Sequence, residues 1–247
     1  MNVIPQKKPL LSTWAIYTPG NFISETQLES LIYSSEEVHH NPFEIHPFES
    51  VTPLTINDVM LREGLHWNYP WFQEEYVEDL KVFKRPYKTK NQEAKIACAL
   101  SHYLLWKKAA VERQPILILE HDATFIEQLD NDDIKRILAS DKLFIGINDP
   151  RRATRRAADF HKSIQSNKAE IQECPWVEKS FSVIQGLAGG SAYILKPKGA
   201  SLLLDSVNRY GLWINDAQIC HQMFPKSLGV TRQYFTKIQD QAISTTT

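Results

Sequence analysis

The sequence predicts an α/β fold with a mainly parallel sheet flanked by helices. Residues 116–119 and 143–147 are short apolar runs, typical of strands that are buried on both faces. Each run follows a stretch with helical character, and strands that alternate with helices favour parallel pairing. With 247 residues, the chain is long enough to form one large domain with a substantial core.

The first third of the chain predicts one strand and one helix before a long irregular stretch. Residues 14–17 are β-prone and end at the turn signal 18–20. Ser24 and Gln27 have capping-box spacing, so we expect a helix to begin there. Residues 39–87 predict mostly loops with short helices.

Aromatic residues and prolines concentrate in this irregular stretch. They are Phe43, Pro47, Phe48, Trp67, Tyr69, Trp71, Phe72 and Tyr76. Two interpretations stay open: these side chains pack under long loops, which we favour, or they form a binding surface.

The clearest helix is expected over 91–112, where apolar residues recur at three- and four-residue spacing on one stripe. Asn131, followed by two acids, is a good start for the helix before the strand at 143–147. We predict no internal repeat. The later elements are expected to be a strand at 181–184, a loop at 186–190, a strand at 191–195, a helix from Pro197, a helix from Asn215 to Met223 and a frayed tail at 240–247.

Composition excludes several classes of protein. The chain has 29 acidic residues and 28 Lys and Arg, and this balance argues against a nucleic-acid partner. Three cysteines, Cys98, Cys174 and Cys220, are too few for a disulfide framework and form no zinc-ribbon pair. The sequence has no signal-peptide pattern and no apolar run of the roughly 20 residues that span a bilayer. A cytoplasmic protein, or one peripheral to a membrane, is therefore expected.

Glu120, His121 and Asp122 follow the buried strand at 116–119. Ligand sites in open α/β sheets lie beyond the carboxyl ends of the strands. If the extended geometry continues, Glu120 and Asp122 project to one side and His121 to the other. Two carboxylates on one side suit Mg²⁺ or Mn²⁺, although acids at a strand end are more often simple loop caps.

The segments 95–106 and 116–123 together resemble glycosyltransferase family 25, which includes lipopolysaccharide, lipooligosaccharide and collagen galactosyltransferases. The family pattern reads roughly G-E-I-G-C-x-x-S-H-x-x-x-W, followed by an apolar strand that ends in L-E-D-D-A. The matching positions are Cys98, Ser101, His102, Trp106, Leu119, Glu120, Asp122 and Ala123. Residues 190–195 and 199–200 are similar to the family's G-T-x-A-Y-x-I…G-A segment, and Asp216 lies where the family often has an aspartate.

The resemblance covers residues 95–225 and implies a single GT-A-like (Rossmann-like) domain over 1–247. Residues 91–225 would form the donor-site core, and the poorly matched residues 1–90, with their aromatic-rich loops, would select the acceptor. The implied reaction transfers a sugar, galactose, from a UDP-sugar to a glycan or lipopolysaccharide-type lipid-linked acceptor with inversion. An inverting displacement needs a base for the acceptor hydroxyl.

The resemblance also implies roles for individual residues. Glu120, His121 and Asp122 would hold a divalent metal, with Mn²⁺ preferred over Mg²⁺ because it accepts imidazole more readily. Asp216 would be the catalytic base, although a simple N-cap is an equal alternative. The residues expected to bind the nucleotide donor are Ser101, His102, Glu120, Asp122, Gly190 and Ser191. A buried structural role for His102 is also open.

Four departures from the family pattern keep other functions open. Lys95 replaces a glutamate, Ala94 and Ala97 replace glycines, and His121 replaces the central aspartate. A non-catalytic nucleotide-sugar or glycan-binding descendant of the fold is one alternative. An unrelated metal-dependent hydrolase that uses Glu120 and Asp122 is the other.

Two further groups of residues are weaker candidates. Arg151, Arg152, Arg155 and Arg156 could bind a diphosphate or an anionic acceptor, but a solvated face is the favoured interpretation. His39, His40 and His46 could suggest zinc, but adjacent histidines in an extended chain face opposite sides.

Overall fold

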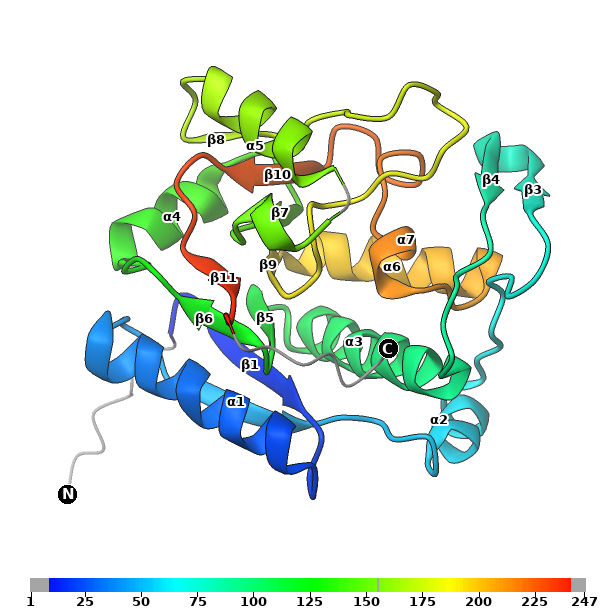
Figure 1. The fold of residues 1–247 in the computed structure, drawn as a ribbon, viewed down its shortest axis with the longest axis horizontal. Helices are drawn as coiled ribbons and strands as arrows, with labels where there is room; N and C mark the ends of the chain where they lie inside the picture. Colours follow the sequence, from blue (N-terminus) through cyan, green and yellow to red (C-terminus); the bar gives the residue numbers. More distant parts are fainter. Residues whose placement is uncertain (1–8, 155, 241–247) are drawn as a thin grey trace.

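The computed structural model describes residues 9–154 and 156–240, and a seven-stranded sheet forms its centre (Figure 1). The strands are β1 (Ser12–Tyr17), β2 (Ile45–Glu49), β5 (Ile116–Glu120), β7 (Phe144–Gly146), β8 (Ile171–Glu173), β9 (Ala192–Leu195) and β10 (Leu228–Thr231). Their order is β2-β1-β5-β9-β7-β10-β8. Only β9 and β8 run against the other five strands. The predicted α/β fold with a mainly parallel sheet flanked by helices is confirmed.

Helices cover both faces of this sheet (Figure 1). They are α1 (Phe22–Tyr33), α2 (Ile56–Glu63), α3 (Gln92–Glu112), α4 (Asn131–Ala139), α5 (Ala157–Ser166), α6 (Pro197–Tyr210) and α7 (Asn215–Gln218). In β5, Ile116 and Ile118 belong to the core with α2, α3 and α6, whereas Leu117 and Leu119 face α1 and α4. This alternation explains the continuous apolar run, because both faces of the strand are buried.

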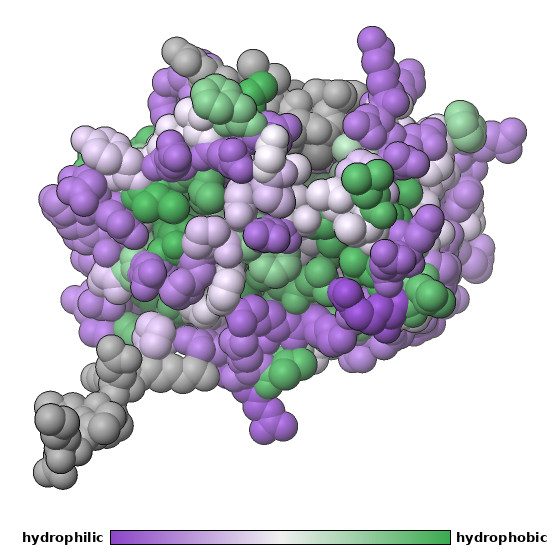
Figure 2. Space-filling model, turned by 90° about the horizontal axis from the view of Figure 1, so that it is seen from below, coloured by the Kyte–Doolittle hydropathy of each residue, from purple (hydrophilic) through white to green (hydrophobic). Residues whose placement is uncertain are grey.

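Two antiparallel pairs lie outside the central sheet. They are β3 (Glu75–Val77) with β4 (Val82–Lys84), and β6 (Ala123–Phe125) with β11 (Thr236–Ile238). Short helical turns occupy Ser34–Val38, Glu78–Leu80 and Pro150–Arg152. No helix among the described residues is both long and apolar enough to cross a membrane. Seen from below the view of Figure 1, the surface is hydrophilic toward its rim, with hydrophobic side chains gathered nearer the middle (Figure 2).

Several sequence predictions of secondary structure were wrong. Helix α1 is capped by Asn21, and the Ser24 hydroxyl instead accepts the Thr18 N–H. Residues 181–184 form a loop rather than a strand, and the helix from Asn215 ends at Gln218 instead of Met223. The predictions made for the first eight residues, for Arg155 and for the tail after residue 240 lie outside the described residues.

The irregular stretch also contains β2, a strand of the central sheet that was predicted as loop. Pro47 interrupts its pattern, and a proline is tolerated only where no ladder hydrogen bond is required. β2 is the edge strand and pairs with β1 alone, with Pro47 opposite Ala15. The loop that follows β2 is held to α3, because the buried Ser101 hydroxyl accepts the Val51 N–H at 2.9 Å.

We expect Ser101→Ala to lower the free energy of unfolding by about 1–3 kcal/mol, because the buried Val51 N–H loses its acceptor. Ser201→Ala is the matched control, since both hydroxyls donate to the carbonyl four residues earlier and Ser201 is exposed. Urea denaturation of both variants measures the difference. Equal destabilisation would show that the Val51 contact contributes nothing.

Candidate active site

The carboxyl ends of the neighbouring strands β2, β1 and β5 border a cavity of about 240 Å³. The end of β5 contributes Glu120, His121 and Asp122, and the first half of α3 contributes Cys98. The loop after β2 closes another side with residues 50–53. The cavity therefore lies where ligands of open α/β sheets bind.

The alternation expected for Glu120, His121 and Asp122 was wrong, because β5 ends at Glu120. His121 and Asp122 form a turn, and all three side chains border the same cavity. Gln239 stabilises this turn: its N–H donates to the Asp122 carbonyl at 2.8 Å, and its side-chain amide donates to the His121 carbonyl at 3.2 Å. Gln239 was not predicted as a site residue, because nothing local in the sequence marks its long-range contact.

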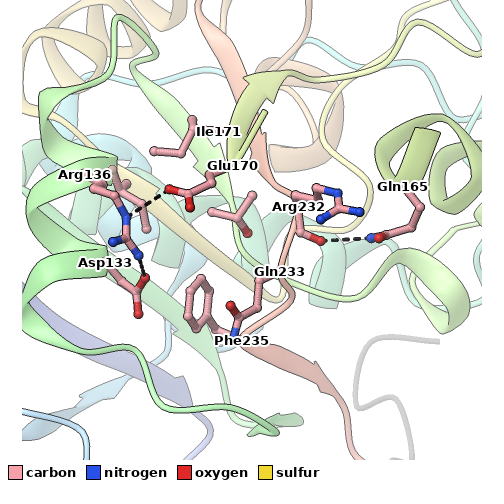
Figure 3. Close-up of a pocket in the computed structure, with 10 residues that line it drawn as sticks. Asp133, Arg136, Gln165, Glu170, Ile171, Arg232, Gln233 and Phe235 are labelled. Atoms are coloured by element: carbon pink, nitrogen blue, oxygen red, sulfur yellow. Dashed lines mark hydrogen bonds and ion pairs between the residues drawn. The ribbon is translucent and has the colours of Figure 1, made fainter. Parts of the chain in front are cut away.

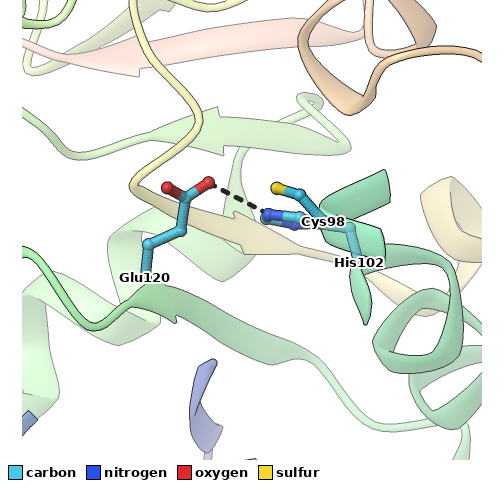
Figure 4. A group of neighbouring side chains, drawn as sticks. All are labelled: Cys98, His102 and Glu120. Carbon is cyan, nitrogen blue, oxygen red and sulfur yellow. Dashed lines mark hydrogen bonds and ion pairs between the residues drawn. The ribbon is translucent and has the colours of Figure 1, made fainter. Parts of the chain in front are cut away.

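A chain of buried hydrogen bonds leads to Glu120. The Trp106 indole donates to the Tyr193 hydroxyl at 2.8 Å, and this hydroxyl lies 2.9 Å from Nδ1 of His102. His102 Nε2 lies 3.1 Å from Oε1 of Glu120 (Figure 4). An ionised Glu120 only accepts, so His102 donates from Nε2 and its Nδ1 accepts from Tyr193. His102 is thus a positioning residue that orients Glu120.

The carboxylates of Glu120 and Asp122 repel each other. Burial alone would raise the pKa of Glu120, but the hydrogen bond from His102 holds it below its ordinary value. Burial and the charge of Glu120 together raise the pKa of Asp122 to about 7. Burial also lowers the pKa of His121, although Glu120 opposes this shift.

Asp216 lies at the start of α7, and the loop that contains Gly190 packs against it. A Cβ atom at Gly190 would meet Oδ1 of Asp216 at 2.5 Å, so only glycine leaves room for the carboxylate. Although solvent reaches Asp216, the surrounding protein and the charge of Glu120 raise its pKa above the ordinary value. The structure therefore brings Asp216 into electrostatic contact with the end of β5.

Lys95 and Cys98 complete the surroundings of these carboxylates. The positive charge of Lys95 lowers the pKa values of Glu120, Asp122 and Asp216, so it compensates part of their negative charge. Burial, followed by the charge of Glu120, raises the pKa of the Cys98 thiol well above its ordinary value. Cys98 is therefore a protonated thiol and not a nucleophilic thiolate.

The arrangement of donors fits a divalent cation best at Glu120 and Asp122. Oδ1 of Asp122 is buried and has no hydrogen-bond partner among the described residues. Cys98, His102 and Glu120 also place one ligand atom each within 4.8 Å of one another. However, both ring nitrogens of His102 already form hydrogen bonds, so a metal bound there would replace the bond to Glu120 or the bond to Tyr193. Two carboxylates make the hard-oxygen site.

The remaining predicted donor-binding residues lie behind the cavity. Ser101 is fully buried and bonds to Val51, as described above. The Ser191 carbonyl accepts the Glu120 N–H at 2.8 Å, while its hydroxyl is buried and unpartnered among the described residues. Gly190 provides room for Asp216. These three residues position the site and do not border the cavity at the end of β5.

None of the described weaker candidates borders the cavity at the end of β5. Each described member of the arginine group pairs with a carboxylate, Arg151 with Asp149, Arg152 with Asp240 and Arg156 with Asp159. The suggested zinc histidines form no cluster of metal ligands among the described residues.

Another cavity, of about 250 Å³, lies between α4, α5 and β10 (Figure 3). Arg136 pairs there with Asp133 and Glu170, and the Gln165 amide donates to the Arg232 carbonyl. Its polar groups largely satisfy one another, and none of the residues of the two sequence motifs borders it.

We expect Tyr193→Phe to cost about 1–3 kcal/mol of stability, because the Trp106 N–H and His102 Nδ1 both lose a buried partner. Tyr234→Phe is the matched control, since it removes a hydroxyl that bonds His161 at 3.1 Å outside the cavity. Thermal denaturation measures stability, and ¹⁵N NMR of the imidazole nitrogens reports the tautomer. An unchanged His102 spectrum in Tyr193→Phe would contradict the hydrogen-bond chain.

Comparison with known proteins assigns this chain to a family. The model of glycosyltransferase family 25, described as an LPS biosynthesis protein, matches residues 33–218. No curated protein matches the chain significantly. The chain is similar to the crystal structure of mouse xyloside xylosyltransferase 1 in its apo form, at 7% identity and a TM-score of 0.46, covering 88% of this chain and 83% of that chain. Because the family model spans more than half of the sequence, the chain belongs to glycosyltransferase family 25 and is a glycosyltransferase.

Proposed function

We propose that this glycosyltransferase transfers galactose from a UDP-sugar to a hydroxyl of a glycan acceptor, with inversion at the anomeric carbon. The observation that carries the proposal is the pair Glu120 and Asp122, with the buried and unpartnered Oδ1 of Asp122, at the carboxyl edge of the sheet. Asp216 lies within electrostatic reach of this pair. The proposed base would therefore act close to the proposed donor site.

Glu120 and Asp122 would hold a divalent cation, with His121 at the border of the same cavity. The bound cation supplies positive charge to the departing diphosphate. We favour Mn²⁺ over Mg²⁺ because Mn²⁺ tolerates an imidazole ligand. Lys95 adds a fixed positive charge beside the carboxylates, where a diphosphate would also need it.

Asp216 would act as the base. Its carboxylate takes the proton of the acceptor hydroxyl while the hydroxyl oxygen attacks the anomeric carbon, and the bond to the UDP oxygen breaks with its electron pair on the leaving group. The raised pKa of Asp216 makes it a better proton acceptor than an aspartate of ordinary pKa. The acceptor would be a lipopolysaccharide-type, lipid-linked saccharide, as the family description suggests.

We expect UDP with Mn²⁺ to raise the melting temperature of the protein by about 5–10 °C at a hundredfold excess over Kd. Asp122→Ala should abolish this shift and the Mn²⁺-dependent hydrolysis or transfer of UDP-galactose. Asp205→Ala is the control, because Asp205 is exposed on α6 and remote from the cavity.

Each outcome of this experiment distinguishes the proposed function from one alternative. A shift without turnover of any nucleotide sugar would favour a non-catalytic binding protein. Unaltered turnover in Asp122→Ala would remove Asp122 from the metal role. If UDP and Mn²⁺ together leave the melting temperature unchanged, the proposed donor site is wrong.

We expect Gly190→Ala to lower kcat by about 10²-fold or more, because the new methyl group displaces the Asp216 carboxylate from its place. KM for the donor should change little. Gly146→Ala is the matched control: its new Cβ would lie 3.7 Å from its nearest neighbours, an ordinary contact. Steady-state kinetics of both variants test this, and an unchanged kcat in Gly190→Ala would contradict Asp216 as base.

A further inference from the structure

An open cavity of about 700 Å³ lies outside the proposed donor site. Its border combines the aromatic side chains of Trp71, Phe72 and Tyr87 with the cationic side chains of Lys88 and Lys90. Phe72 is 84% exposed, so its ring is accessible from solvent. The cavity thus offers aromatic faces and positive charge together.

The aromatic part of this cavity is held in place before any ligand arrives. The Trp71 ring stacks on Trp67 at 5.2 Å with an angle of 7° between the planes. The Trp67 indole donates to the Tyr69 carbonyl at 2.8 Å, and the Tyr87 N–H donates to the Pro70 carbonyl at 3.3 Å. A preformed surface of this kind loses little conformational entropy when it binds a ligand.

The cavity adjoins the proposed reaction centre through Tyr87. The Lys95 ammonium lies 5.1 Å from the centre of the Tyr87 ring, and the same ammonium acts on the carboxylate of Asp216. Tyr87 also packs against the apolar cluster that contains Ile214 and Ala217, on either side of Asp216 along the chain. A molecule in this cavity would therefore extend toward the proposed base.

The positive charge at the rim is not neutralised by the protein. Lys88 and Lys90 are exposed and form no ion pair with any residue that the structure describes. Two cations of the preceding segment differ in this respect, because Lys84 pairs with Glu75 at 2.7 Å and Arg85 pairs with Glu74 at 3.4 Å. Two unpaired ammonium groups beside a cavity attract an anionic ligand.

We propose that this cavity binds the acceptor and selects a saccharide that carries carboxylate or phosphate groups. The apolar face of a sugar ring stacks on Trp71 and Phe72, and Lys88 and Lys90 pair with the anionic group. This inference rests on the proposed function, since it presumes that an acceptor reaches Asp216. It also assigns a role to aromatic residues that the sequence alone favoured as packing under loops.

The test compares saccharides that differ only in charge. Tetragalacturonate is compared with its full methyl ester, and singly phosphorylated maltotetraose with maltotetraose, by calorimetry and tryptophan fluorescence on the full chain. We expect the anionic member of at least one pair to bind about tenfold or more tightly than its neutral partner, and the difference to shrink with salt.

Lys88→Gln/Lys90→Gln should remove this preference, and Phe72→Ser should weaken binding of both members of the pair. Lys162→Gln/Lys168→Gln is the matched control, because these two lysines are exposed elsewhere on the molecule. All three variants should keep the melting shift with UDP and Mn²⁺ and the hydrolysis of the donor.

Different experimental results would contradict the acceptor site and the proposed donor site. Equal binding within both pairs, or a preference that survives Lys88→Gln/Lys90→Gln, would overturn the anionic acceptor site while the UDP shift persists. Loss of the UDP shift with intact saccharide binding would instead contradict the donor site. If only vesicles of phosphatidylglycerol bind, and do so through Phe72 and Lys88, the cavity is a lipid-contact surface and the proposal is wrong.

Discussion

The hydrogen bond between His102 and Glu120 is the interaction on which the rest of the site depends. It connects α3 to the end of β5, and Tyr193 extends the connection to β9. His102 is completely buried. An unpaired ring nitrogen would therefore destabilise the folded state by several times the free energy that an ordinary exposed hydrogen bond contributes. The chain from Trp106 to Glu120 satisfies every group in turn. These hydrogen bonds consequently hold Oε1 of Glu120 in place and leave the other carboxylate oxygen available at the cavity.

Because the Glu120 carboxylate is held in place, its negative charge repels the neighbouring carboxylates when no ligand is bound. Asp122 and Asp216 both lie within the field of Glu120, and Lys95 offsets only part of their charge. A fold selected for stability alone would not place carboxylates so close together in a partly buried recess. Such local conflict is typical of functional sites, where a bound cation or substrate restores the balance of charge.

Local physical chemistry made part of this structure predictable from the sequence. The runs at 116–119 and 143–147 are buried on both faces, and the stripe of α3 faces the sheet, so pattern and burial agree. The predictions failed where the local structure depends on contacts with residues that are distant in the sequence. Pro47 is acceptable in β2 only because that strand lies at the edge, which depends on its pairing with β1. The turn at 121–122 depends on Gln239, more than a hundred residues away. Neither constraint is visible in any local window.

The first turns of α3 explain how one helix can serve two adjoining cavities. Ala94, Ala97 and Cys98 border the cavity at β5, whereas Lys90 and Gln92 border the aromatic one. Lys95 lies on the same turns and interacts with the Tyr87 ring and with the carboxylates. A lysine at this position therefore places positive charge near both cavities, and it would couple the proposed donor site to the proposed acceptor site.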